Sequence, residues 1–155
     1  MPDNRLVWER EDIQAEYDVA TYELMQRRLF EKGWMQTRTI LDLGIDSGHM
    51  LDLGAGPGYL GLDWLRQTSG TRLTGLDINE EFISHAKENA ERLGLADRAD
   101  FVLGQGDTLP FDDGTFDAVC SNGSFHEWEK PRELLAEIWR VLAPSGKCFI
   151  SDHRR

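Results

Sequence analysis

The pattern of apolar residues changes near residue 49, and this change divides the chain into two parts. In the first part, from Asp12 to Trp34, apolar residues recur at the spacing of a helix, and Gly33 could end that helix. A second, shorter helix is expected over residues 37–43. We therefore expect residues 1–48 to form a helical segment that precedes the main body of the fold.

In the second part, short apolar runs alternate with longer segments of helical periodicity. A short apolar run is typical of a strand that is buried on both faces of a parallel sheet. Strands separated by helices form parallel βαβ units, so we expect an α/β fold with a doubly wound, Rossmann-like sheet, strand order 3-2-1-4-5 and helices on both faces. The expected strands are 49–53, 72–76, 99–103, 116–120 and 147–151, and the expected helices are 58–68, 79–93 and 131–142.

A repeated tetrapeptide needs care when the first strand is placed. The residues Leu-Asp-Leu-Gly occur at 41–44 and again at 51–54. Only the second copy is followed by further glycines at alternate positions, so we assign the first copy to the end of the helix over 37–43. Turns are expected at 46–48, before the first strand of the sheet, and at 144–146, before the last.

The composition is that of an ordinary globular protein with one domain. The chain has 155 residues, 40% of them hydrophobic, and no apolar run approaches the ~20 residues that span a bilayer. The first residues lack the pattern of a signal peptide. Cys120 and Cys148 lie in strand-like runs without the spacing of metal ligands. We expect two buried, reduced thiols, no metal site, no membrane association and a cytoplasmic location.

The chain is strongly acidic, with a formal net charge of −11. Binding of nucleic acid without regard to sequence depends on Lys and Arg contacts to phosphates. We therefore expect no nucleic-acid partner. An acidic protein is compatible with a small ligand that is neutral or cationic.

Three glycines follow the first strand of the sheet at alternate positions: Gly54, Gly56 and Gly58. A strand, a glycine turn and a helix bring backbone amides close to a ligand, and a Cβ would block both the turn and the approach. Such turns also occur without a ligand. Asp52 lies just before the turn and could accept hydrogen bonds from the amides of the loop itself.

Further polar residues follow the next two strands, and the carboxyl ends of parallel strands share one edge of a sheet. Asp77 comes about nineteen residues after Gly58. Its carboxylate could accept hydrogen bonds from two ribose hydroxyls, or it could cap the helix over 79–93. Ile78 could cover one face of a purine. Asp107 could accept from the exocyclic amine of adenine, or it could be an ordinary turn residue.

These segments together resemble a class I S-adenosylmethionine-dependent methyltransferase. Within that class the resemblance is to the small-molecule group that includes methyltransferase type 11 and the ubiquinone/menaquinone-biosynthesis enzymes. It covers roughly residues 49 to 152, with the segments in the family's order. The matching segments are 51–58, Asp77, 106–112, 116–119 and 138–146.

The resemblance implies a binding site for S-adenosylmethionine, with S-adenosylhomocysteine as the product. The glycine loop would line the methionine part of the cofactor, Asp77 would bind the ribose, and Asp107 would hold the adenine amine. The implied cofactor residues are Asp52, Gly54, Ala55, Gly56, Gly58, Asp77, Ile78, Gly106, Asp107, Thr108 and Asn122.

The implied reaction is an in-line transfer of a methyl group to a small-molecule acceptor, in which correct positioning supplies most of the rate. A hydroxyl or amine acceptor would also need a base. His126 is the first candidate and Glu127 the second, although a structural role for His126 is the alternative. The acceptor atom stays open. Candidate acceptor contacts are Tyr17, Tyr22, Phe125 and Trp128, with Trp8 and Trp34 as further possibilities, while Trp64 and Trp139 are assigned to packing.

Two other functions are kept open. Residues 56–61 match the GxGxxG pattern of dinucleotide-binding oxidoreductases, but Gly54 precedes the pattern, Pro57 interrupts it, and 106–107 would have no role. A non-catalytic cofactor-binding or partner module is the other. The family's sheet usually continues with strands 6 and 7, whereas this chain stops at Arg155, so we expect an exposed edge at the last strand and a homodimer formed through it.

Overall fold

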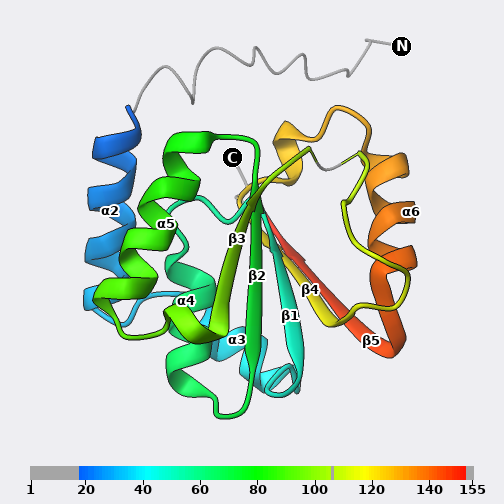
Figure 1. The fold of residues 1–155 in the computed structure, drawn as a ribbon, viewed down its shortest axis with the longest axis horizontal. Coiled ribbons are helices and arrows are strands. Elements are labelled where there is room, and N and C mark those ends of the chain that lie inside the picture. The colour runs from blue at the N-terminus through cyan, green and yellow to red at the C-terminus, as the bar shows by residue number, and fades with distance from the viewer. Residues whose placement is uncertain (1–17, 106, 153–155) are drawn as a thin grey trace, which may run out of the picture.

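A five-stranded parallel sheet with the order β3-β2-β1-β4-β5 forms the centre of the molecule (Figure 1). The computed structural model describes residues 18–105 and 107–152. The strands are β1 (His49–Leu53), β2 (Arg72–Asp77), β3 (Ala99–Leu103), β4 (Phe116–Asn122) and β5 (Leu142–Ser151). The fold class and the strand order expected from the sequence are confirmed.

Within residues 18–105 and 107–152, five α-helices and two short 3-10 helices join and cover these strands. The α-helices are α2 (Val19–Glu31), α3 (Thr37–Asp42), α4 (Tyr59–Gln67), α5 (Glu80–Arg92) and α6 (Pro131–Val141). The 3-10 helices are η1 (Ala96–Arg98) and η2 (Phe125–Glu127). Within the described residues, no helix has the length and apolar character needed to cross a bilayer.

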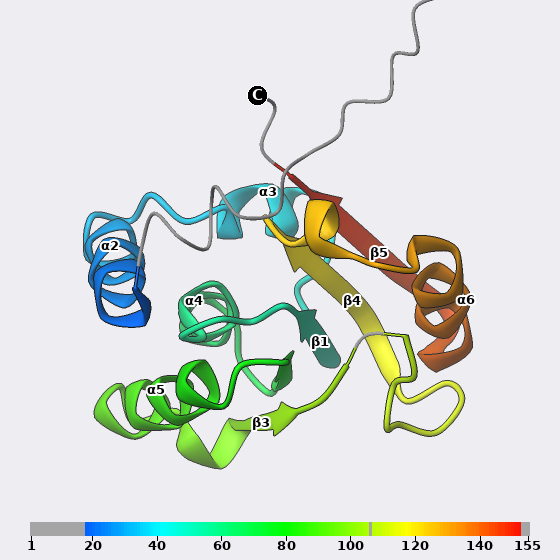
Figure 2. The same ribbon diagram turned by 90° about the horizontal axis from the view of Figure 1, so that it is seen from above.

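The helices lie on two sides of the sheet, with α2, α4 and α5 on one side and α6 on the other (Figure 2). The side chains of alternate residues of β1 point to opposite sides of the sheet. Met50 packs with residues of α3, α4 and α5, whereas Leu51 packs with residues of α6. Both side chains are fully buried, which explains why the strand appears in the sequence as an unbroken apolar run.

The ends of α2 and α5 follow from their local sequences. Asp18 caps α2 by accepting a hydrogen bond from the Thr21 amide at 2.7 Å, and Gly33 after the helix has a φ of 68°. In α5 the cap is Asn79, whose Oδ1 accepts from the amides of Glu81 and Phe82. Gly33 was predicted to end the first helix, whereas the caps Asp18 and Asn79 were not predicted.

The last strand differs from the expectation. The segment 144–146, expected as a turn before the strand, lies inside β5 as an irregularity. The register with β4 passes from Phe116 opposite Leu142 to Ala118 opposite Lys147, and Ser145 has a φ of 68°. The extra residues bulge out of the ladder, so the strand begins earlier than the turn signal indicated.

Two side chains expected to be buried are exposed. Trp139 has 81% of its surface exposed, because α6 turns Leu134, Ile138 and Val141 toward the sheet and Trp139 lies outside that face. Cys148 is exposed on β5, which is an edge strand of this sheet. Cys120 is buried on the inner strand β4, as expected, and both cysteines are free thiols.

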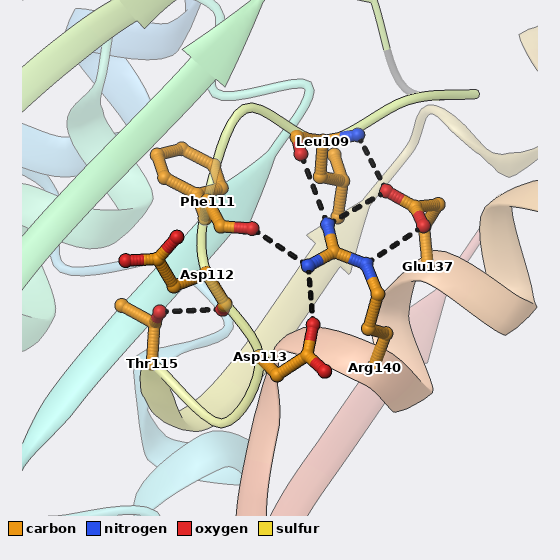
Figure 3. A network of polar contacts seen from close by, with 7 residues as sticks. All are labelled: Leu109, Phe111, Asp112, Asp113, Thr115, Glu137 and Arg140. Carbon is orange, nitrogen blue, oxygen red and sulfur yellow. Dashed lines mark hydrogen bonds and ion pairs between the residues drawn. The ribbon is translucent and has the colours of Figure 1, made fainter.

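Arg140 ties the segment between β3 and β4 to α6 (Figure 3). Its guanidinium donates to the carbonyl oxygens of Leu109 and Phe111, at 3.0 and 2.7 Å, and pairs with Asp113 at 2.8 Å. Glu137 holds the guanidinium from α6 and accepts a hydrogen bond from the Leu109 amide at 2.8 Å. The network fixes the backbone two residues after Asp107.

Candidate active site

The glycine loop joins the carboxyl end of β1 to the start of α4. Gly54, Gly56 and Gly58 have φ values of 72°, 54° and 85°, a region that other residues rarely adopt. Gly58 is the residue directly before α4, so the helix begins at the end of the loop. The backbone therefore forms a tight turn at the sheet edge where the sequence placed the ligand.

The loop amides are held by β2 rather than by Asp52. The amides of Gly54 and Ala55 both donate to the carbonyl oxygen of Leu76, at 2.8 and 3.1 Å. The amide of Gly56 donates to Oδ2 of Asp77 at 2.8 Å. The expectation that the Asp52 carboxylate bonds these amides is therefore wrong, because the acceptors are the Leu76 carbonyl oxygen and the Asp77 carboxylate of β2.

Close neighbours explain why two of the three glycines have no side chain. A Cβ on Gly54 would lie 2.7 Å from both Cβ and Oγ of Ser124, and one on Gly58 would lie 3.0 Å from the Phe101 ring. A Cβ on Gly56 would have only an ordinary contact, at 3.6 Å, with the ring of Tyr22. The loop is packed tightly at its two ends, and the ring of Tyr22 faces its middle.

Asp77 lies at the end of β2 and faces the glycine loop. Besides the Gly56 amide, its carboxylate accepts a hydrogen bond from the Asn79 amide at 2.9 Å. Burial raises the pKa of Asp77, and the hydrogen bonds from Asn79 and Gly56 partly oppose that rise. Because Asn79 caps α5, the alternative that Asp77 is the helix cap is ruled out.

Tyr22, which comes from α2, lies close enough to three carboxyl groups to feel their charges. Burial raises the pKa of Tyr22, and the negative charges of Glu127, Asp77 and Asp52 raise it further. The four side chains come from α2, β1, β2 and η2. The structure thus brings together Asp52, Asp77 and Glu127, which the sequence had placed at separate strand ends.

Asp52 is the most deeply buried of these carboxyl groups, with 3% of its surface exposed. Burial raises its pKa from 3.8 to about 7, with the charge of Asp77 as the second cause. The protonated form of Asp52 is therefore accessible near neutral pH.

Asn122 ends β4 and carries an unpaired acceptor. Its Oδ1 is buried and has no hydrogen-bond partner among the described residues. An unsatisfied buried acceptor costs about 1–3 kcal/mol, so native proteins seldom keep one without a reason. A polar ligand that donates a hydrogen bond here would remove that cost.

His126 and Glu127 lie in η2, directly after β4. The His126 amide donates to Oδ2 of Asp152 at 2.7 Å, and its Nδ1 lies 2.9 Å from Oδ1 of the same carboxylate. Its Nε2 lies 3.7 Å from Oε1 of Glu127. Asp152 follows the end of β5 and was missed from the sequence. Its place directly after a strand, like that of Asp77, was the signal that could have found it.

The two aromatic residues of this loop that were predicted to contact the acceptor, Phe125 and Trp128, differ in exposure. Phe125 is 40% exposed and packs against Trp128, with ring centroids 4.8 Å apart and the ring planes tilted by 55°. Trp128 packs against the core below α6, and its Nε1 donates to Oγ of Ser124 at 3.3 Å. The structure therefore leaves Phe125 the better placed of the two for contact with an acceptor. Tyr17 and Trp8 lie outside the described residues.

The residues expected at the adenine lie on the same edge of the sheet. Ile78 is 66% exposed just after β2, and Thr108 is exposed after β3. Asp107 pairs with Lys130 at 3.4 Å, with both side chains partly exposed. Gly106 lies outside the described residues. No group of three or more metal-binding side chains gathers in the described part of the chain.

The amino-acid sequence matches one protein family. Residues 51–150 match the family model described as a methyltransferase domain. Over 134 residues, the chain is 33% identical to the demethylmenaquinone methyltransferase of Thermus thermophilus, covering 84% of this chain and 60% of that protein. Over 103 residues, it is 32% identical to the ubiquinone/menaquinone biosynthesis C-methyltransferase UbiE of Roseobacter denitrificans, covering 66% of this chain and 41% of that protein.

A solved structure gives the same result. The fold is similar to the crystal structure of a candidate S-adenosyl-L-methionine-dependent methyltransferase from Methanococcus maripaludis, with a TM-score of 0.80 and 28% sequence identity. The similarity covers 85% of this chain and 61% of that one. The chain matches between 41% and 61% of the length of these three proteins.

The packing of the glycine loop can be tested with Gly54→Ala. The left-handed backbone should cost about 1–2 kcal/mol of unfolding free energy, and the contact with Ser124 should add about 1–3 kcal/mol. Gly70→Ala is the matched control, since Gly70 has a φ of 67° and nothing near its Cβ position. Urea denaturation should show the larger loss for Gly54→Ala. Equal losses would show that the contact with Ser124 does not constrain the loop.

The raised pKa of Asp52 predicts a pH-dependent stability. The pKa of Asp52 is raised from 3.8 to about 7 in the folded protein. Between these two pH values the folded protein keeps the proton of Asp52, whereas the unfolded chain has released it. The carboxyl group therefore destabilises the fold increasingly as the pH rises toward 7. Asp52→Asn should stabilise the protein more at pH 8 than at pH 5, by on the order of a few kcal/mol. Urea denaturation at the two pH values measures this.

The exposed Asp46 provides the control for that experiment. The effect of Asp46→Asn should change little between the two pH values. If the effect of Asp52→Asn were equally flat, burial would not raise the pKa of Asp52.

Proposed function

The chain belongs to the methyltransferase domain family, and from this membership we propose that it binds S-adenosylmethionine and transfers the methyl group to a small-molecule acceptor. The observation that carries the proposal is the glycine loop at the carboxyl edge of the sheet, with the Gly56 amide bonded to the Asp77 carboxylate. Parallel sheets of this type bind ligands at this edge. No observation on the described residues favours an oxidoreductase or a non-catalytic module.

The described residues fit such a cofactor by their chemistry. The glycine loop leaves room for a backbone to approach a ligand, and Asn122 has a buried oxygen that needs a donor such as an amine. The Asp77 carboxylate has more acceptor sites than the two amides occupy. Asp52, Gly54, Ala55, Gly58, Ile78, Asp107 and Thr108 complete the proposed site, and Gly106 is proposed from the sequence alone.

When bound, S-adenosylmethionine supplies a methyl group that is already activated by a sulfonium. The residues of this chain then have to position the acceptor, exclude water and accept a proton where the acceptor has one. Tyr22 and Phe125 are the proposed acceptor contacts, together with Trp128 and, from the sequence, Tyr17. His126 and Glu127 are the proposed bases.

Cofactor binding can be tested by calorimetry with S-adenosylhomocysteine. The wild-type chain should bind it, and Asp77→Asn should weaken binding by about tenfold to a hundredfold. The reason is that hydrogen bonds to a charged acceptor are worth about 1.5–3 kcal/mol. Asp97→Asn, at an exposed position in η1, is the matched control and should bind like the wild type.

The result would go against the proposal if the folded wild-type chain did not bind S-adenosylhomocysteine. It would go against the role of Asp77 alone if Asp77→Asn bound as tightly as the control. Circular dichroism of each variant separates a loss of binding from a loss of fold.

We also propose the cytoplasm as the location and a homodimer formed through β5. The support for the dimer is that β5 lies at the outer edge of the described sheet, and an edge strand offers backbone groups for pairing. Sedimentation velocity at micromolar concentration should show a dimer. Cys148→Lys, on the edge strand, should shift it toward the monomer, whereas Leu24→Lys, exposed on α2, should not. A monomeric wild-type protein would contradict the dimer.

A further inference from the structure

The imidazole of His126 is held from one side by the carboxylate of Asp152, the residue directly after β5. Both oxygens of Asp152 lie within hydrogen-bond distance of Nδ1, at 2.9 and 3.0 Å, and one of them also accepts from the His126 amide. Because β4 and β5 run parallel with Asn122 opposite Ser151, the residues that follow the two strands meet at the same edge. The ring on η2 is therefore oriented by the segment that follows β5.

This contact decides which ring nitrogen is basic. A carboxylate accepts hydrogen bonds and does not donate them, so Nδ1 carries the hydrogen in this contact. In the neutral ring, Nε2 then has the free electron pair. The same relation between a carboxylate, Nδ1 and a basic Nε2 is known from hydrolases that use histidine as a base.

The loop that carries His126 is fixed against the glycine loop. Gly123 donates to the Ser151 carbonyl at 2.8 Å, and Oγ of Ser124 lies 2.7 Å from the position of a Cβ on Gly54. On the other side of the ring, Nε2 lies 3.7 Å from Glu127, whose charge acts on Tyr22. The Tyr22 ring in turn faces Gly56, at 3.6 Å from the position of a Cβ there, so Glu127 links His126 electrostatically to the glycine loop.

We propose that Asp152 is a positioning residue that holds His126 as the general base for an acceptor hydroxyl group. The inference rests on the proposed function and adds the class of the acceptor, an alcohol or phenol. A neutral hydroxyl is a weak nucleophile and gains most when a base removes its proton. A carboxylate that fixes the imidazole tautomer serves this step directly.

The atoms balance without any further reactant. The O–H bond of the acceptor breaks, the proton moves to Nε2 of His126, and its electron pair stays on the acceptor oxygen. An oxygen–carbon bond to the methyl group forms, and the carbon–sulfur bond breaks with its electron pair remaining on sulfur. Asp152 stays ionised and stabilises the resulting imidazolium through Nδ1.

The first test is nitrogen-15 NMR of the histidine rings in the full-length chain, at a pH where the ring of His126 is neutral. The wild type should carry the ring proton on Nδ1. Asp152→Ala should shift His126 toward the Nε2–H form that free histidine favours. Glu88→Ala, which removes an exposed carboxylate from α5, should leave the spectrum of His126 unchanged. The proposal is overturned if the wild-type ring of His126 carries its proton on Nε2. It is also overturned if Asp152→Ala leaves the spectrum of His126 the same as in the wild type.

The second test is methyl transfer from S-adenosylmethionine to a panel of a phenol, an alcohol, a primary amine and a thiol of similar size. We expect transfer to oxygen. His126→Ala should lower the rate constant by about a hundredfold or more, and Asp152→Ala by about tenfold or more. His85→Ala, on α5, is the matched control and should leave the rate unchanged.

The outcomes separate this inference from the proposed function. Failure to bind S-adenosylhomocysteine would contradict the proposed function. The NMR result would still show whether Asp152 positions the ring of His126. If the chain binds S-adenosylhomocysteine but methylates neither the phenol nor the alcohol, the proposed acceptor class is wrong. If oxygen is methylated and His126→Ala is as fast as the control, His126 is not the base.

Discussion

The backbone of the glycine loop has no room for side chains at its ends, and the rest of the site depends on that constraint. Ser124 occupies the space next to Gly54, and the Phe101 ring occupies the space next to Gly58. The loop is therefore held between β3 on one side and the segment after β4 on the other, while its amides bond the end of β2. The carboxylate of Asp77 then completes the arrangement by bonding the Gly56 amide.

Charge is the second determinant of the site. Burial raises the pKa of Tyr22, nearby carboxyl groups raise it further, and burial raises the pKa of Asp52 to about 7. Carboxyl groups gathered at this edge of the sheet favour a ligand that carries positive charge, and the sulfonium of S-adenosylmethionine is one. The same burial makes the site costly for the folded chain, because a buried carboxyl group near another carboxylate destabilises the protein when it ionises. This combination is typical of functional sites.

Most of the fold could be predicted because the signals are local. Buried parallel strands give apolar runs, and Gly33 marks the end of α2 at short range. The errors concern contacts between distant segments. The exposure of Trp139 depends on which face of α6 meets the sheet, and the bulge in β5 depends on its register with β4. The partner of His126 lies 26 residues away and is brought near only by that register. The glycine loop, by contrast, was placed correctly because strand, turn and helix are contiguous in the sequence.

The most direct test of the account is a crystal structure of the chain with S-adenosylhomocysteine. The account predicts that the ligand lies against Gly54–Gly58, with its ribose hydroxyls donating to Asp77 and its amine donating to the buried Oδ1 of Asn122. A ligand bound elsewhere on the protein would contradict the account. So would a ligand that leaves both Asp77 and Asn122 without a contact.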